Sequence, residues 1–284
     1  MKAFVSIIST DNYSLGAIIL YESLKLTGTQ FPFFLVVTQD VSIDCEILLK
    51  KYGIKIIRDN DRLWTSDIRI NINEKRWSYS FDKLKIFKLE QFSKIVYLDS
   101  DMYVVANIDS LFTYSHLTAV PTRSKMKWLN NQRYFNSGIM VIEPSKNEFI
   151  RITKFLKPTI DEFYKRNVAL GDQDVLHNSF LDWPLKSHLH LADGFNVFWS
   201  SIDLYLRKYN YTLKKDNTKN QIYVIHFTGS HKPWMKSFIF ILLSVIRPIK
   251  NLQTIPLKSV INFIFFYRKM VMDVQTKLSK IQNG

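Results

Sequence analysis

Short apolar runs alternate with segments of helical periodicity through the first hundred residues. Apolar runs of about four to eight residues are typical of buried strands, whereas apolar positions three and four apart are typical of helices. The pattern predicts strands over 3–9, 33–37, 54–57 and 95–98. It predicts helices over 13–26, 45–52 and 80–92. Strands that alternate with helices favour a mainly parallel sheet covered on both faces.

Predicted strands and helices alternate less regularly in the second part of the chain. Its pattern predicts a strand over 138–142, a helix over 149–164, a short helix over 172–180 and a late strand over 222–227. In open α/β sheets the ligand lies beyond the carboxyl ends of the strands. The polar residues that follow the predicted strands are therefore the first candidates for a functional site.

Length and composition fit one large α/β domain, or one domain with an appendage. The chain has 284 residues, of which 46% are hydrophobic and 23% are charged, which supplies a core and argues against global disorder. Cys45 is the only cysteine, so no intrachain disulfide can form and we expect a reducing, cytoplasmic location. No stretch reaches the roughly 18–20 apolar residues of a membrane-spanning helix. The N-terminal apolar run, interrupted by serine, fits a first strand better than a signal peptide.

Positive charge is concentrated near the C-terminus. The whole chain has a formal net charge of +14, and residues 237–284 carry +6 of it together with many aromatic and aliphatic side chains. This composition is typical of helices that lie in a membrane interface. We therefore predict a catalytic domain over 1–236 and an amphipathic tail over 237–284 that binds an anionic membrane surface. A helical cap over the core, or a dimer contact, is the alternative.

Two carboxylates follow the fourth predicted strand. Asp99 and Asp101 are two positions apart, and residues i and i+2 of an extended chain project to the same side. Two carboxylates that repel each other there can be held together by a divalent cation, which prefers oxygen ligands. The alternative is a polar strand end at which Asp101 caps the next segment.

A second polar motif follows the late strand. It reads Val224-Ile-His226-Phe-Thr-Gly229-Ser-His-Lys232-Pro-Trp234. His226 would add a nitrogen ligand to the carboxylates, a mixed set that suits manganese. Gly229 permits close approach of the backbone to a phosphate, and Lys232 supplies a positive charge for it. A core histidine followed by a turn is the alternative interpretation.

Two weaker motifs contain amides and carboxylates. Phe135-Asn-Ser-Gly138 begins a predicted strand, where its polar side chains can bind sugar hydroxyls or simply form a turn. Gly171-Asp-Gln-Asp174 precedes a predicted helix. Asp172 fits a helix N-cap, but capping explains only one of the three polar side chains at this turn.

In this order and spacing, the motifs resemble those of glycosyltransferase family 8, over roughly residues 3–236. The resemblance implies a GT-A fold, which is a Rossmann-like, mixed but mainly parallel sheet flanked by helices. It also implies a UDP-sugar donor, Mn²⁺ with Mg²⁺ as a possible substitute, and transfer with retention at the anomeric carbon. The tail composition predicts a peripheral location at the inner face of the cell membrane, and this location suggests a glycan or lipid-linked saccharide acceptor. Such an acceptor fits the bacterial members of the family that build surface glycans.

The resemblance also assigns roles by position. The metal ligands would be Asp99, Asp101 and His226. The donor-binding residues would be Thr10 and Tyr13 at the uridine, together with Lys83, Ser100, Asn136, Ser137, Gly229 and Lys232. The residues closest to catalysis would be Lys83, Asp172 and Gln173. The chain departs from glycogenin at Ala169, where that protein has an aspartate, so self-glucosylation is not expected.

Two other functions fit part of the sequence. The segment from Val96 to Asp101 is similar to the nucleophile motif of haloacid-dehalogenase phosphatases, in which the first aspartate attacks phosphate. That interpretation leaves the motif around His226 unexplained. A non-catalytic basic binding protein would fit the net charge, but the sequence contains no recognised nucleic-acid motif, so nucleic acid is not an expected partner.

Overall fold

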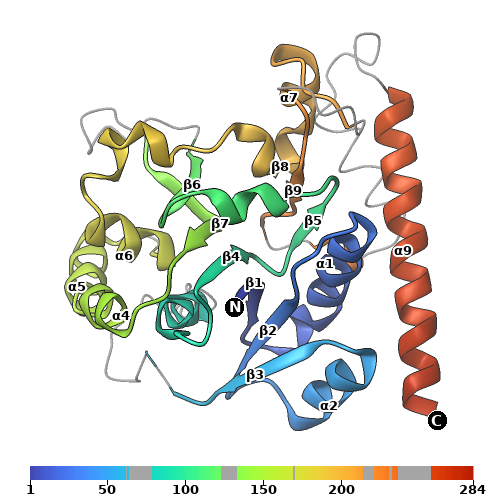
Figure 1. The fold of residues 1–284 in the computed structure, drawn as a ribbon, viewed down its shortest axis with the longest axis horizontal. Helices are drawn as coiled ribbons and strands as arrows, with labels where there is room; N and C mark the ends of the chain where they lie inside the picture. Colours follow the sequence, from blue (N-terminus) through green and yellow to red (C-terminus); the bar gives the residue numbers. More distant parts are fainter. Residues whose placement is uncertain are drawn as a thin grey trace.

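A six-stranded sheet forms the centre of the molecule (Figure 1). The computed structural model describes residues 1–61, 63, 79–122, 133–168, 170–213, 220–229, 232–235 and 257–283. The strands, in the order β3-β2-β1-β4-β7-β6, are Lys55–Asp59, Phe33–Thr38, Lys2–Ile8, Lys94–Leu98, Phe135–Ile142 and Thr118–Pro121. The first four are parallel, whereas β7 is antiparallel to both of its neighbours. The predicted mixed, mainly parallel sheet is confirmed.

A small second sheet lies beside the first and carries the late motif. It consists of β5 (Met102–Val104), β9 (Val224–His226) and β8 (Val197–Phe198) in that order. The antiparallel register between β5 and β9 pairs Met102 with His226. Because β5 begins directly after Asp101, this pairing brings two motifs together that are more than a hundred residues apart in the sequence.

Helices cover both faces of the large sheet (Figure 1). One group is α1 (Ser14–Leu26), α2 (Ile43–Tyr52) and α9 (Leu257–Asn283), and the other is α4 (Lys146–Thr153), α5 (Leu156–Arg166) and α6 (Asp172–Ser179). The alternation of side chains along β1 supplies both cores, because Phe4 packs in the cluster with α1 and α2 while Val5 packs with α6. Helix α7 (Ile202–Lys208) lies between β8 and β9 in the sequence, and short 3₁₀ turns connect several elements.

Two predicted helices differ in the structure. The segment expected to be α-helical over 80–92 is a 3₁₀ helix over Tyr79–Lys88, and every side chain from Phe81 to Phe87 is buried. With no exposed face, the segment lacks the single apolar stripe that selects the α-helical period. The helix expected over 149–164 is divided into α4 and α5. Pro158 lies in the first turn of α5, where its ring would clash with the carbonyl of Lys154 if one helix continued through.

Helix α9 packs its apolar face against α1 and α2 (Figure 1). The side chains buried on this face recur at helical spacing and join the core cluster: Val260, Ile264, Tyr267, Met270 and Val274. Phe265, Phe266 and Met272 are exposed on the other side. Among the described residues, no helix has the length and apolar character needed to cross a bilayer. The apolar run over 238–246 and the predicted boundary after residue 236 lie outside the described residues.

Candidate active site

The two carboxylates of the first motif lie in a turn at the end of β4. The N–H of Met102 donates to the carbonyl of Asp99 at 3.1 Å, and the N–H of Asp99 donates to the carbonyl of Gly138 at 2.9 Å. The expected extended geometry of Asp99 and Asp101 is therefore wrong, because the chain reverses here to enter β5. The turn still directs both carboxylates to one side of the sheet edge.

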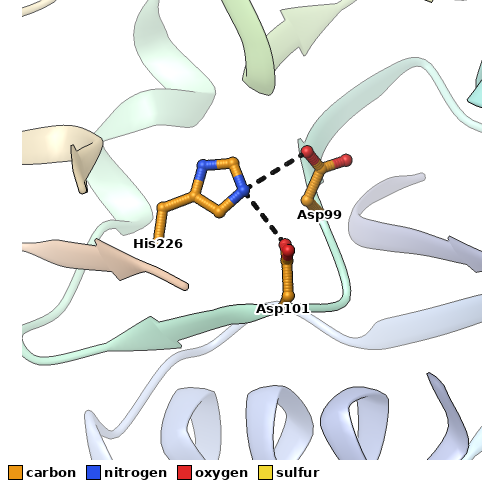
Figure 2. Close-up of side chains that lie close together, drawn as sticks. All are labelled: Asp99, Asp101 and His226. Atoms are coloured by element: carbon orange, nitrogen blue, oxygen red, sulfur yellow. Dashed lines mark ion pairs between the residues drawn. The ribbon is translucent and has the colours of Figure 1, made fainter. Parts of the chain in front are cut away.

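Asp99, Asp101 and His226 converge at this turn (Figure 2). Nε2 of His226 lies 3.0 Å from Oδ1 of Asp101 and 3.6 Å from Oδ2 of Asp99. One ligand atom from each residue can be chosen so that all three lie within 4.8 Å of one another. Two carboxylate oxygens and one imidazole nitrogen at this separation fit a divalent cation such as Mn²⁺. The two predicted motifs therefore form one candidate metal site.

Two buried lysines flank the carboxylates. Nζ of Lys83 lies 3.0 Å from Oδ1 of Asp99 and 2.9 Å from Oδ2 of Asp172. Nζ of Lys232 forms an ion pair with Asp101 and donates to the carbonyl of Phe227 at 2.8 Å. Each lysine thus holds a positive charge beside one carboxylate of the first motif, and Lys83 also links that motif to Asp172.

The buried charges shift each other's protonation. Burial alone would lower the pKa of Lys83, but the carboxylates of Asp172 and Asp99 outweigh it and raise that pKa. Burial raises the pKa of Asp99 above its ordinary value, against the opposing effects of Lys83 and His226. For Asp101 burial acts in the same direction, yet His226 and Lys232 overcome it and the pKa is lowered. Lys83 therefore favours the charged form of Asp99, Lys232 favours that of Asp101, and His226 acts on both.

The residues predicted to surround the donor sugar form one network. Oγ of Ser137 donates to Oδ2 of Asp172 at 2.7 Å and accepts from Nζ of Lys83 at 3.1 Å. Oε1 of Gln173 accepts from the backbone N–H of Ser137 at 3.1 Å and from Nδ2 of Asn136 at 3.2 Å. The start of β7 and the start of α6 are joined by these contacts, next to the candidate metal site.

Asp172 does not cap the helix, contrary to the alternative interpretation of its motif. Helix α6 begins at Asp172 itself, and the N-cap position is Gly171. The carboxylate of Asp174 accepts from the N–H of Gly171 at 2.9 Å and performs the capping role. The Asp172 side chain is consequently available for Ser137 and Lys83.

One of the two predicted uridine residues, Tyr13, lies near the second lysine. Tyr13 ends the short 3₁₀ turn Asp11–Tyr13, and the centroid of its ring lies 5.8 Å from Nζ of Lys232. Thr10 precedes that turn and makes no side-chain capping bond.

Ser100 is buried in the turn between the two aspartates. Gly229 has a φ of +93°, a conformation that L side chains rarely adopt.

Sequence reasoning missed two side chains of the site. The hydroxyl of Tyr97 donates to Oδ1 of Asp99 at 2.6 Å, and its position near the end of β4, two residues before Asp99, could have indicated this. Oδ1 of Asn196 lies 3.0 Å from Nδ1 of His226. Asn196 precedes β8 and belongs to no motif, so only the tertiary structure identifies it.

Comparisons with known proteins identify the family of this chain. The family model described as Glycosyl transferase family 8 matches residues 4–237. Uncharacterized protein R707 of Acanthamoeba polyphaga mimivirus is 32% identical over 246 residues, which cover 82% of this chain and 82% of that protein. A putative UDP-glucuronate:xylan alpha-glucuronosyltransferase 3 of Arabidopsis thaliana is 29% identical over 236 residues, and the matched part is 82% of this chain but only 35% of the plant protein.

One solved structure extends the agreement to the fold. The crystal structure of the galactosyltransferase LgtC, in complex with donor and acceptor sugar analogues, superposes with a TM-score of 0.63 at 16% identity. The superposition covers 96% of this chain and 96% of LgtC. At this identity the likeness establishes a shared GT-A fold.

Proposed function

The chain belongs to glycosyltransferase family 8, and from this membership we propose that it transfers a hexose from a UDP-sugar to an acceptor with retention at the anomeric carbon. The convergence of Asp99, Asp101 and His226 within 4.8 Å carries the proposal. The plant relative, which is named for a UDP-sugar donor, supports it.

Departure of the nucleotide is the step that this site would assist. Cleavage of the bond between sugar and diphosphate leaves negative charge on the β-phosphate oxygen. A divalent cation held by Asp99, Asp101 and His226 would supply Lewis-acid stabilisation of that charge. Lys232 would add a fixed ammonium, since Phe227 and Asp101 already position its Nζ. Tyr13, near the same lysine, is the proposed stacking partner of the uridine.

The network around Asp172 and Gln173 would position the donor sugar. Both lone pairs of the Gln173 carbonyl have donors, and Oδ2 of Asp172 is bound by Lys83 and Ser137. Such engaged groups are weak nucleophiles, which supports attack by the acceptor on the face from which the diphosphate leaves, rather than a covalent enzyme intermediate. Lys83 would hold Asp99 and Asp172 at a fixed separation during this step.

The phosphatase interpretation explains only one of the two polar motifs. Family membership over residues 4–237 covers both polar motifs, including the one around His226 that a phosphatase leaves unexplained. We therefore set the phosphatase aside, together with a non-catalytic basic binding protein.

The outer face of α9 supports a peripheral membrane location. The exposed side chains along this helix include Lys258, Lys269 and Lys280 together with Phe265 and Phe266. Basic and aromatic side chains on one exposed face are suited to binding an anionic bilayer surface. An acceptor attached to a lipid, or another surface glycan, would then lie next to the enzyme at the cytoplasmic face. The inner face of α9 packs on the domain, so the proposal concerns the outer face alone.

A panel of UDP-sugars tests the proposed donor class. The purified full chain is incubated with each sugar nucleotide and Mn²⁺, and released UDP is measured alongside inorganic phosphate. The proposal expects UDP from at least one UDP-hexose, without phosphate release in parallel. Phosphate release from simple phosphomonoesters, with no UDP from any donor, would contradict it.

A further inference from the structure

We propose that Asn196 is a positioning residue that fixes the tautomer of His226 and connects this metal ligand to the donor-sugar residue Gln173. The proposal rests on the proposed metal-dependent function. Asn196 lies between Asp193–Phe195 and β8, its side chain is 3% exposed, and neither the sequence motifs nor the family resemblance assigned it a role.

A continuous line of side-chain contacts carries the inference. Oδ1 of Asn196 lies 3.0 Å from Nδ1 of His226, and Nδ2 of Asn196 lies 2.6 Å from Oδ1 of Asn136. Nδ2 of Asn136 in turn lies 3.2 Å from Oε1 of Gln173. The line therefore runs from the candidate metal site to the candidate sugar site through two amide groups.

Two backbone N–H groups determine the direction of every bond in this line. Gly138 N donates to Asn136 at 2.9 Å, and Ser137 N donates to Gln173 at 3.1 Å. A backbone N–H can only donate, so the atoms that receive these bonds must be the amide oxygens. This removes the usual ambiguity between the oxygen and nitrogen of an amide group.

The assignment of the Asn136 oxygen then determines the tautomer of His226. With its Oδ1 fixed as an acceptor, Asn136 requires a donor from Asn196, which must present its NH₂ group there. The carbonyl oxygen of Asn196 consequently faces Nδ1 of His226, which has to carry a proton. A neutral imidazole protonated at Nδ1 has its lone pair at Nε2, the atom that lies beside Asp99 and Asp101 (Figure 2).

The same line orients the other end. The Gln173 carbonyl accepts from Asn136 and Ser137, so the remaining polar part of this side chain is its NH₂ group. Asn196 thus orients two side chains at once. It leaves the NH₂ group of Gln173 available for the donor sugar and the lone pair on Nε2 of His226 available for the metal. A purely structural role, in which Asn196 only fastens the start of β8 to β7, would support stability without these two directional effects.

Two substitutions separate the directional roles. Asn196→Leu removes both bonds at similar volume. Asn196→Asp keeps an acceptor for Nδ1 of His226 but replaces the donor to Asn136 with a second acceptor. Asn178→Leu is the matched control, because Asn178, at the far end of α6 from Gln173, bonds to Thr159 of α5 and not to the line of contacts. Binding of Mn²⁺ alone is measured by electron paramagnetic resonance, with spin-echo modulation from ¹⁴N to detect a coordinated imidazole, and kcat for UDP release is measured separately.

The expected results differ for each variant. Asn196→Leu should weaken Mn²⁺ binding about 10- to 100-fold, the usual loss when the partner of a metal-bound histidine is removed, and should lose the ¹⁴N signal. Asn196→Asp should bind Mn²⁺ with the ¹⁴N signal intact but lose at least tenfold in kcat, because Gln173 is no longer held. Asn178→Leu should resemble the wild type in both measurements.

Specific outcomes would overturn the proposal. Wild-type Mn²⁺ affinity and ¹⁴N modulation in Asn196→Leu would do so while leaving the proposed function intact. If Asn196→Leu does not fold, Asn196→Asp decides, since either a wild-type kcat or a loss of Mn²⁺ affinity as large as that of His226→Ala contradicts the proposal. Absence of Mn²⁺ binding in the wild type would overturn this proposal and the metal-dependent function together.

Discussion

Cε1 of His226 lies so close to Gly138 that a Cβ atom at the glycine would be only 2.7 Å from it. Met102 and Asn136 also approach this position, at 2.8 and 2.9 Å. Any larger residue would therefore displace the imidazole or the strand. The third residue of the Asn-Ser-Gly motif is required because β9 packs against β7 at the candidate metal site.

Gly138→Ala should consequently damage the site more than the fold. We expect a destabilisation of about 1–3 kcal/mol from overpacking and at least a tenfold loss of Mn²⁺ affinity, measured by titration calorimetry. Gly53→Ala is the control. Gly53 has a φ of +106°, so alanine there is also strained, but the strain lies at the end of α2, far from the metal ligands. Similar Mn²⁺ affinity in both variants would show that His226 does not need the glycine.

Substitutions next to the proposed sugar should affect turnover rather than nucleotide binding. Asp172→Asn and Gln173→Ala are each expected to lower kcat by about 10²-fold or more while UDP affinity stays within about threefold of the wild type. Their contacts are with Lys83 of the 3₁₀ helix and with Asn136 and Ser137 at the start of β7. Equal losses of UDP affinity and kcat in both variants would assign these residues to the nucleotide instead.

Asp174 should make stability depend on pH below neutrality. Burial raises the pKa of its carboxyl to about 6, against the opposing hydrogen bond from the backbone of Gly171. Between about pH 4 and pH 6 the folded state binds more protons than the unfolded state, so stability falls as pH rises through this window. Above pH 6 the buried charge costs up to about 3 kcal/mol, and about 1–2 kcal/mol is a realistic expectation.

Asp174→Asn tests this dependence, because its amide oxygen can still accept from Gly171. The variant should have a higher Tm than the wild type at pH 7.5, a similar Tm near pH 4, and a flatter profile between them. Asp161→Asn, on the exposed surface of α5, should leave the profile unchanged. A variant less stable than the wild type at pH 7.5 would show that the capping bond needs the charge.

The two faces of α9 should respond differently to substitution. Replacing the exposed Lys258, Lys269 and Lys280 with glutamate should abolish sedimentation with anionic liposomes and leave Tm within a few degrees of the wild type. Tyr267→Ala, on the buried face, should cost about 3–5 kcal/mol, because Tyr267 packs against Tyr103 and Phe227. Salt-independent binding to neutral and anionic vesicles alike would contradict the electrostatic contribution.

Local sequence patterns predicted most of the sheet because each strand is a short apolar run. They also placed Asp99, Asp101 and His226 at strand ends, where a shared site is expected. Three features depend on tertiary contacts that no local pattern contains. Pairing of β5 with β9 brings His226 to the aspartates, burial of the whole 79–88 segment selects a 3₁₀ helix, and Asn196 acquires its role only through its spatial neighbours.

We propose that Asp99, Asp101 and His226 support metal-dependent release of UDP from a UDP-sugar. The most direct measurement compares UDP release by the wild type and by Asp101→Asn, each with Mn²⁺ and with excess EDTA. We expect release by the wild type in Mn²⁺, near-complete loss in EDTA with recovery on added Mn²⁺, and a rate for Asp101→Asn in Mn²⁺ that is at least about a hundredfold below that of the wild type. Full activity of the wild type in EDTA, or an unimpaired Asp101→Asn, would contradict it.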